Sequence, residues 1–229
     1  MRLLIYSAVV AFTTVPAYAN SWLDSIEYGL TVELEAAHNT SQDKEQKRQL
    51  LFTPDISANL FTDTMLNIEG RWIYDGLDEI QLDQNQFQLR TFTLETSYKD
   101  SYLTLGKQQI VWGKADGLKV LDVVNPQRWH EFTLDDADDS RIPLWAINIE
   151  TSLGDNNLQI ISVLEQEYHD FADTNTAYAF TSSKLIPTPP SSIPITVQTT
   201  QKPKRTLKNA DLGLRLNGFA NGWDYSFIY

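Results

Sequence analysis

Charged side chains are concentrated in one stretch, Leu105 to Pro143, which begins and ends in strand-like residues and carries a loop of roughly thirty residues between them. Acidic residues outnumber basic ones there, and a ring of carboxylates in a narrow aqueous passage selects cations over anions. The pattern predicts an ion-selective constriction if the loop folds into a pore. Alternatively, the carboxylates pair with Arg141 and backbone amides to fix the loop, or face water. The ionisable residues concerned are Lys114, Asp116, Lys119, Asp122, Arg128, Glu131, Asp135, Asp136, Asp138, Asp139 and Arg141.

Calcium binding is a second chemistry for this stretch, because Asp135, Asp136, Asp138 and Asp139 cluster oxygen ligands that suit a hard cation. The spacing and the glycine of an EF-hand loop are absent, so calcium is the weaker hypothesis. The glycines of the stretch predict tight turns, since no phosphate-binding pattern surrounds them. We therefore expect no cofactor.

Catalytic chemistry is disfavoured by the placement of the histidines. His38, His130 and His169 lie in predicted loops, and no serine and aspartate are spaced to complete a triad. The chain contains no cysteine, which excludes a thiolate nucleophile and a thiolate metal site. Carboxylate pairs such as Glu33 and Glu35 are ordinary in the polar lining of a pore. We expect a protein that is not an enzyme.

The first residues predict export. A basic start at Arg2, an apolar segment and the sequence Ala17-Tyr18-Ala19 are typical of a secretory signal peptide, so we expect residues 1–19 to be cleaved before Asn20. The alternative is a buried first strand of a cytosolic domain. The formal net charge of −12 disfavours nucleic acid as a partner, because its recognition needs clustered cations.

The rest of the chain, 20–229, alternates between apolar and polar residues, as strands with one apolar face do. The alternation from Ile26 to Ala36 is long enough for a tilted crossing of a membrane, which needs about nine to eleven residues. A change of parity after Phe87 predicts a β-bulge near Arg90 or Thr91. The expected strands cover 26–36, 50–60, 66–74, 87–98, 102–112, 145–153, 158–167, 210–217 and 223–229.

Short and long connections alternate along these strands, and the two longest cover 113–141 and 168–208. An outer-membrane barrel segregates its connections in this way, with short periplasmic turns and long external loops. A secreted β-sandwich is the alternative fold. About nine strands is an odd number, whereas bacterial single-chain barrels have an even one, so we expect the front part of a longer barrel. A closed eight-stranded barrel ending at Tyr229 is the competing interpretation.

A family resemblance rests on the segment LGKQQIVWGKADGLKVLDVVNPQ. It resembles the G-[RK]-Q-x-[IV]-x-W-G … NP segment of porin-like outer-membrane proteins of uncharacterised substrate, which are similar in layout to alginate-export and phosphate-selective porins. The resemblance covers about a tenth of the chain and implies a large barrel whose third external loop folds into the lumen. It implies neither a substrate nor a catalytic residue. The matching residues are Gly106, Lys107, Gln108, Trp112, Gly113, Asn125 and Pro126.

These observations together predict an all-β, antiparallel transmembrane barrel in the outer membrane of a Gram-negative bacterium. We expect passive passage of small hydrophilic solutes or ions with a mild cation preference, and contact with membrane lipid, periplasmic chaperones and the barrel-assembly machinery. An adhesion or envelope-assembly protein, or a secreted β-sandwich binding protein, are the alternatives. The wall residues expected to face the acidic loop are Arg71, Arg90, Lys107 and Arg215.

Overall fold

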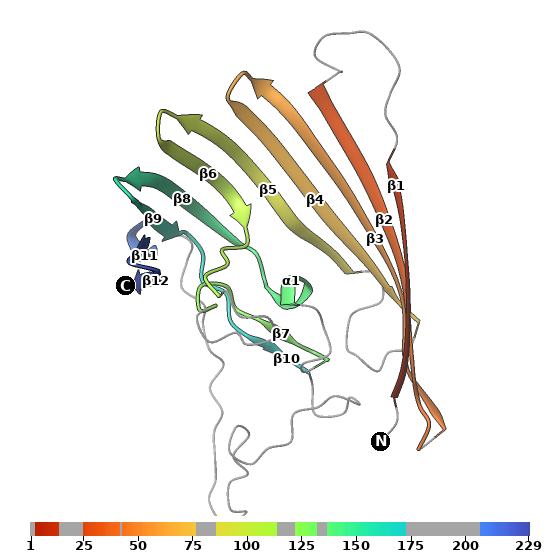
Figure 1. Cartoon of the computed structure of the whole chain (residues 1–229). Coiled ribbons are helices and arrows are strands. Elements are labelled where there is room, and N and C mark those ends of the chain that lie inside the picture. Colours follow the sequence, from red (N-terminus) through yellow and green to blue (C-terminus); the bar gives the residue numbers. More distant parts are fainter. Residues whose placement is uncertain are drawn as a thin grey trace, which may run out of the picture.

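The computed structural model describes residues 3–13, 25–41, 43–76, 86–113, 122–131, 137–172 and 207–229. It contains one antiparallel sheet of ten strands, and each strand pairs with the one before and after it in the sheet order (Figure 1). The strands are β1 (Leu3–Thr13), β2 (Ile26–Asn39), β3 (Lys44–Phe61), β4 (Thr64–Asp75), β5 (Gln86–Tyr98), β6 (Ser101–Gln108), β8 (Leu144–Leu153), β9 (Asn156–Val163), β11 (Asp211–Ala220) and β12 (Trp223–Ile228).

The predicted all-β class is confirmed, and each expected strand is present, although β6 ends at Gln108 and β9 at Val163, before the expected ends at 112 and 167. Short turns join β3 to β4, β5 to β6, β8 to β9 and β11 to β12, and Figure 1 shows them at one end of the sheet. Left-handed backbone at Lys99, Gly154 and Asn221 permits such tight hairpins, because the twist of these turns then matches that of the strands. At the opposite end, β2 and β3 are joined by the short connection 40–43, so the expected long loop between these strands and the expected loop position of His38 are wrong. The connections from β4 to β5, from β6 to β8 and from β9 to β11 are longer and leave from the same end.

The predicted β-bulge is confirmed and falls on Arg90. Thr91 pairs with Glu69 and Leu89 pairs with Gly70, which leaves Arg90 as the extra residue of β5. An extra residue breaks the alternation of faces, so Arg90 and Thr91 both line the polar side of the sheet. The bulge therefore explains the change of parity and places an arginine on the inner face.

The two faces of the sheet have opposite chemistry, and the apolar one is exposed. Ile56, Trp72 and Phe87 on what we term the outer face are 45%, 50% and 57% exposed. The other, inner face carries buried polar residues, and a soluble sheet has the reverse arrangement. Further exposed apolar residues of the outer face are Leu30, Leu34, Phe52, Tyr74, Phe92, Ile160, Leu212, Leu214 and Phe227, and buried polar residues of the inner face include Thr93, Thr104, Gln108, Asn148, Gln159 and Arg215.

Short elements lie against the inner face. These are α1 (Ala137–Ser140) and the parallel pair β7 (Arg128–Trp129) and β10 (Asp170–Phe171). The 3-10 turn η2 (Leu207–Asn209) directly precedes β11. Figure 1 shows α1, β7 and β10 within the curve of the sheet, towards the end away from the short turns. None of the helices in the described ranges is long and apolar enough to span a bilayer.

The sheet is open within the described residues, with β1 and β12 at its two edges. Strand β1 coincides with the apolar segment of the predicted signal peptide and pairs with β2 along its whole length. The signal peptide stays a prediction. Cleavage before Asn20 would remove β1 and leave β2 as the first strand of the sheet.

Candidate functional site

The connection between β6 and β8, residues 109–143, forms what we call the inner loop. Its described parts, 109–113, 122–131 and 137–143, cross the inner face from β6 and β8 towards β3. Salt bridges mark the crossing, since Asp139 contacts Arg71 of β4 and Glu131 contacts Lys47 of β3. The same Lys47 also pairs with Glu35 of β2. The predicted inward folding of the loop is therefore seen against five successive strands of the sheet.

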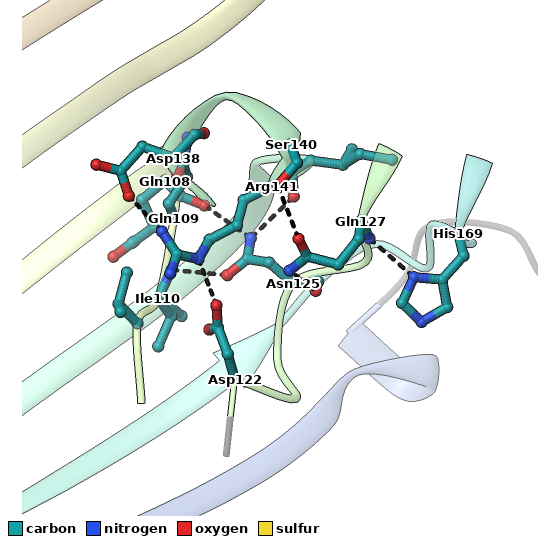
Figure 2. Close-up of polar contacts among 12 residues, drawn as sticks. Gln108, Gln109, Ile110, Asp122, Asn125, Gln127, Asp138, Ser140, Arg141 and His169 are labelled. Atoms are coloured by element: carbon teal, nitrogen blue, oxygen red, sulfur yellow. Dashed lines mark hydrogen bonds and ion pairs between the residues drawn. The ribbon is translucent and has the colours of Figure 1, made fainter. Parts of the chain in front are cut away.

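Asn125 holds the two ends of the inner loop together (Figure 2). Its side-chain oxygen accepts a hydrogen bond from the backbone N–H of Ile110 at 2.7 Å, and its amide nitrogen donates to the carbonyl oxygen of Ile142 at 2.9 Å. Next in the chain, the carbonyl oxygen of Pro126 accepts a bond from the N–H of Ile142 at 2.9 Å. Asn125 is 1% exposed, so water cannot replace these bonds. The Asn125-Pro126 pair therefore holds the two ends of the inner loop together.

The other residues of the motif also pack at the start of the loop. Trp112, 3% exposed, donates its indole N–H to the side-chain oxygen of Gln159 at 2.8 Å. Gln108 donates to the carbonyl oxygens of Thr104 and Ala146. Gly106 has a φ of 127°, and a Cβ there would lie 2.0 Å from the carbonyl oxygen of Phe92. Gly113 packs against Asp122. The motif residues therefore build the loop's base.

Arg90 fastens α1 to the wall. Its guanidinium donates to the backbone carbonyl oxygens of Asp138, Asp139 and Arg141, the last at 3.0 Å. Arg90 is 2% exposed. The carbonyl groups at the end of a helix have no partner within it, and a buried cation satisfies them and the negative end of the helix dipole together. Arg90 therefore contacts the acidic loop, as predicted, but through backbone carbonyl oxygens of the loop.

Most described carboxylates of the loop are paired. Arg141 binds Asp122 and Asp138, as Figure 2 shows, and Arg71 binds Asp139. The structural alternative, in which Arg141 pins the loop, therefore holds for Asp122 and Asp138. Arg128 donates to Gln88 of β5 at 3.0 Å. The predicted site residues Lys114, Asp116, Lys119, Asp135 and Asp136 lie outside the described residues.

Two predicted wall residues are not brought to the carboxylates of the loop that the structure describes. Lys107 lies in register with Phe92 and Trp145, on the other face from its neighbour Gln108, and pairs with Glu165 at 3.3 Å. The expectation that Lys107 faces the acidic loop is wrong, because strand alternation turns it to the apolar face. Arg215 donates to Asn217 at 2.9 Å and reaches the loop only at the carbonyl oxygen of Val111.

The calcium hypothesis can be compared only in part with the structure. Asp138 and Asp139 pair with Arg141 and Arg71, and the described part of the chain holds no group of three or more acidic, histidine or cysteine residues placed for a metal. Of the second long connection, 168–208, the structure describes 168–172 and 207–208. Within it, the side chain of His169 accepts a hydrogen bond from the backbone N–H of Gln127 at 2.9 Å.

A cavity of about 550 Å³, which we call the polar pocket, lies between α1 and strands β4, β5, β6 and β8. Every residue that lines it is polar or charged. The lining contains two cations and four anions, so its net formal charge is −2. The residues are Glu69, Arg71, Arg90, Thr91, Thr93, Glu95, Thr104, Gln108, Gln109, Asp138, Asp139 and Asn148.

The chain matches no protein-family model, no curated protein and no solved structure. The resemblance of its 106–126 segment to porin-like proteins stays a prediction.

Sequence reasoning missed the acids of the polar pocket that come from the wall, Glu69 and Glu95. Both occupy inner-face positions of strands whose alternation was recognised, so the signal was present. It could not be read as a site because the partners of these residues come from β6, β8 and α1, which lie far away in the sequence.

Proposed function

We propose that this chain forms the wall of a porin-like transmembrane β-barrel. Small hydrophilic solutes and ions cross an outer membrane through the lumen of this barrel. The single observation that carries this proposal is the inversion of the sheet. Its exposed face is apolar, and its polar face is covered by a loop that crosses it. A sheet in water hides its apolar face, whereas a sheet in lipid exposes it.

The distribution of aromatic residues supports the same proposal. Beside the short turns, Phe61, Tyr98 and Trp223 are 74%, 73% and 76% exposed. Trp72 and Tyr74 are exposed at the opposite end of β4. Barrels in outer membranes carry two such aromatic girdles, because amphipathic rings favour the boundary between lipid and water. Strands β2 and β3, with 14 and 18 residues, are long enough to reach both boundaries.

The polar side supports a passage with a constriction. The inner loop lies across the sheet, and the polar pocket beside it has a hydrophilic lining of net negative formal charge. An excess of carboxylates in a confined aqueous space favours cations. The mild cation preference of the proposed channel follows from this excess.

Conductance of the purified protein in a planar bilayer under a salt gradient tests the proposal. We expect a reversal potential on the cation-selective side. The double variant Asp138→Asn/Asp139→Asn leaves Arg141 and Arg71 without these carboxylate partners, so the cation preference should fall by up to about five-fold for each charge removed. This estimate follows from about 1 kcal/mol for a unit charge about 4 Å from the ion in water.

The matched control is Asp63→Asn/Asp100→Asn, which removes two charges in exposed short turns. It should keep the selectivity of the unmodified protein, because exposed charges outside the constriction are screened. A folded protein that conducts no ions, or that prefers anions, would contradict the proposed function.

A further inference from the structure

The lining of the polar pocket has an uneven distribution of charge along β4 and β5. Arg71 and Arg90 lie at the end beside α1, where both contact it. Glu69 and Glu95 lie further towards the short turns, since Glu69 pairs with Thr91 and Glu95 with Met65 in the register of the strands. Asp138 and Asp139 of α1 balance the two arginines at that end, whereas Glu69 and Glu95 make the rest of the lining negative.

The end of the pocket beside α1 retains hydrogen-bond capacity. One terminal nitrogen of Arg71 binds Asp139, but the Nε atoms of Arg71 and Arg90 have no acceptor among the described residues. Both are buried atoms, and a buried donor without an acceptor costs about 1–3 kcal/mol. A planar carboxylate is the group that matches the donor fork of a guanidinium. This end of the pocket therefore suits an anionic group of a ligand.

The negative end is short of cations. Glu69 and Glu95 make no salt bridge in the part of the chain that the structure describes, and Glu95 accepts hydrogen bonds from the hydroxyl groups of Thr93 and Tyr102. An ammonium group, which donates three hydrogen bonds, would satisfy such carboxylates. Glu69 and Arg71 are two residues apart on one face of β4, which is about 6.6 Å along the strand.

We propose that the polar pocket binds a small zwitterion of the α-amino acid class, with its carboxylate group on Arg71 and its ammonium group on Glu69. This inference rests on the proposed channel and deepens it, since it names the class of solute that pauses beside the inner loop. A simple anion would face the repulsion of the surplus carboxylates. A simple cation would leave the donors of Arg71 unused. A sugar ring would find no aromatic side chain in the lining to stack on.

The test is a ligand-detected NMR titration of the folded, full-length protein in detergent micelles. The probes are L-alanine, L-alaninamide, which lacks the carboxylate, and N-acetyl-L-alanine, which lacks the ammonium group. We expect saturable binding of L-alanine and at least about ten-fold weaker binding of either analogue, the factor that loss of one charge-assisted hydrogen bond produces.

Variants locate the site. Glu69→Gln and Arg71→Gln should each weaken L-alanine binding by about ten-fold or more. Glu27→Gln, which removes a carboxylate of β2 outside the pocket, should leave it unchanged. Because Arg71→Gln also releases Asp139, the Glu69→Gln variant, which breaks no salt bridge among the described residues, carries the decisive comparison.

Several outcomes would overturn the inference. They are absence of saturable L-alanine binding, binding of L-alaninamide as tight as that of L-alanine, and equal weakening by Glu27→Gln and Glu69→Gln. Binding in micelles does not require conduction. A protein that conducts ions without binding L-alanine therefore refutes the pocket alone, and one that binds L-alanine without conducting refutes the channel alone.

Discussion

Replacing Arg90 by methionine is expected to lower the free energy of unfolding by about 1–3 kcal/mol, the cost of leaving buried carbonyl oxygens without a donor. The methionine keeps much of the apolar volume of the side chain. The carbonyl oxygens of Asp139 and Arg141 lose the donor Arg90, which is 2% exposed, while that of Asp138 keeps a hydrogen bond from Gln109. Asp139 and Arg71 then have to hold α1 against the wall without help from β5.

Urea-induced unfolding of the protein in lipid vesicles measures this loss. The control is Arg48→Met, because the Arg48 side chain is 58% exposed and its removal should change stability by no more than about 0.5 kcal/mol. If the two variants unfolded at the same urea concentration, Arg90 would have no role in fastening the inner loop.

Placing an arginine at Ile56 is expected to cost about 2–4 kcal/mol in a lipid bilayer, the penalty for a cation near the middle of the lipid-facing surface of a barrel. Ile56 is 45% exposed and pairs with Tyr28 of β2 and Ile68 of β4, between the aromatic ends of the strands. The same substitution at a comparably exposed position in water would cost within about 0.5 kcal/mol. The size of the change in stability thus distinguishes an outer face in lipid from an outer face in water.

Thr62→Arg is the matched control for this second prediction, since Thr62 is exposed in the short turn between β3 and β4. It should change the stability by no more than about 0.5 kcal/mol under the same conditions. Equal and small effects of Ile56→Arg and Thr62→Arg would place the outer face in water and favour the secreted β-sandwich.

The strands could be predicted because their information is local. The alternation around Ile56 and Ile68 requires only neighbouring residues, and the parity change between Phe87 and Phe92 predicted a bulge near Arg90 or Thr91 before any pairing was known. The short turns were equally evident from Gly154 and its polar neighbours. Each of these features is decided within about a dozen residues.

The partners of the charged residues could not be predicted, because they depend on contacts between distant segments. The loop carboxylates were expected to be surplus charges, yet Asp122 pairs with Arg141, and Glu131 pairs with Lys47 of β3, far earlier in the chain. Lys107 was expected to face the acidic loop, although it shares the parity of Leu103 and Leu105 in β6. The register places Phe92 and Trp145 on the same face.

The measurement that tests the lipid-facing sheet most directly uses the absence of cysteine from the chain. Single cysteines at Ile56 and at Ser57, on opposite faces of β3, are labelled with an environment-sensitive fluorophore, and the protein is folded into vesicles that contain brominated lipid. We predict blue-shifted emission and strong quenching for the label at Ile56, and neither for the label at Ser57. Quenching of both labels, or of neither, would contradict a sheet whose outer face lies in lipid and whose inner face lines an aqueous passage.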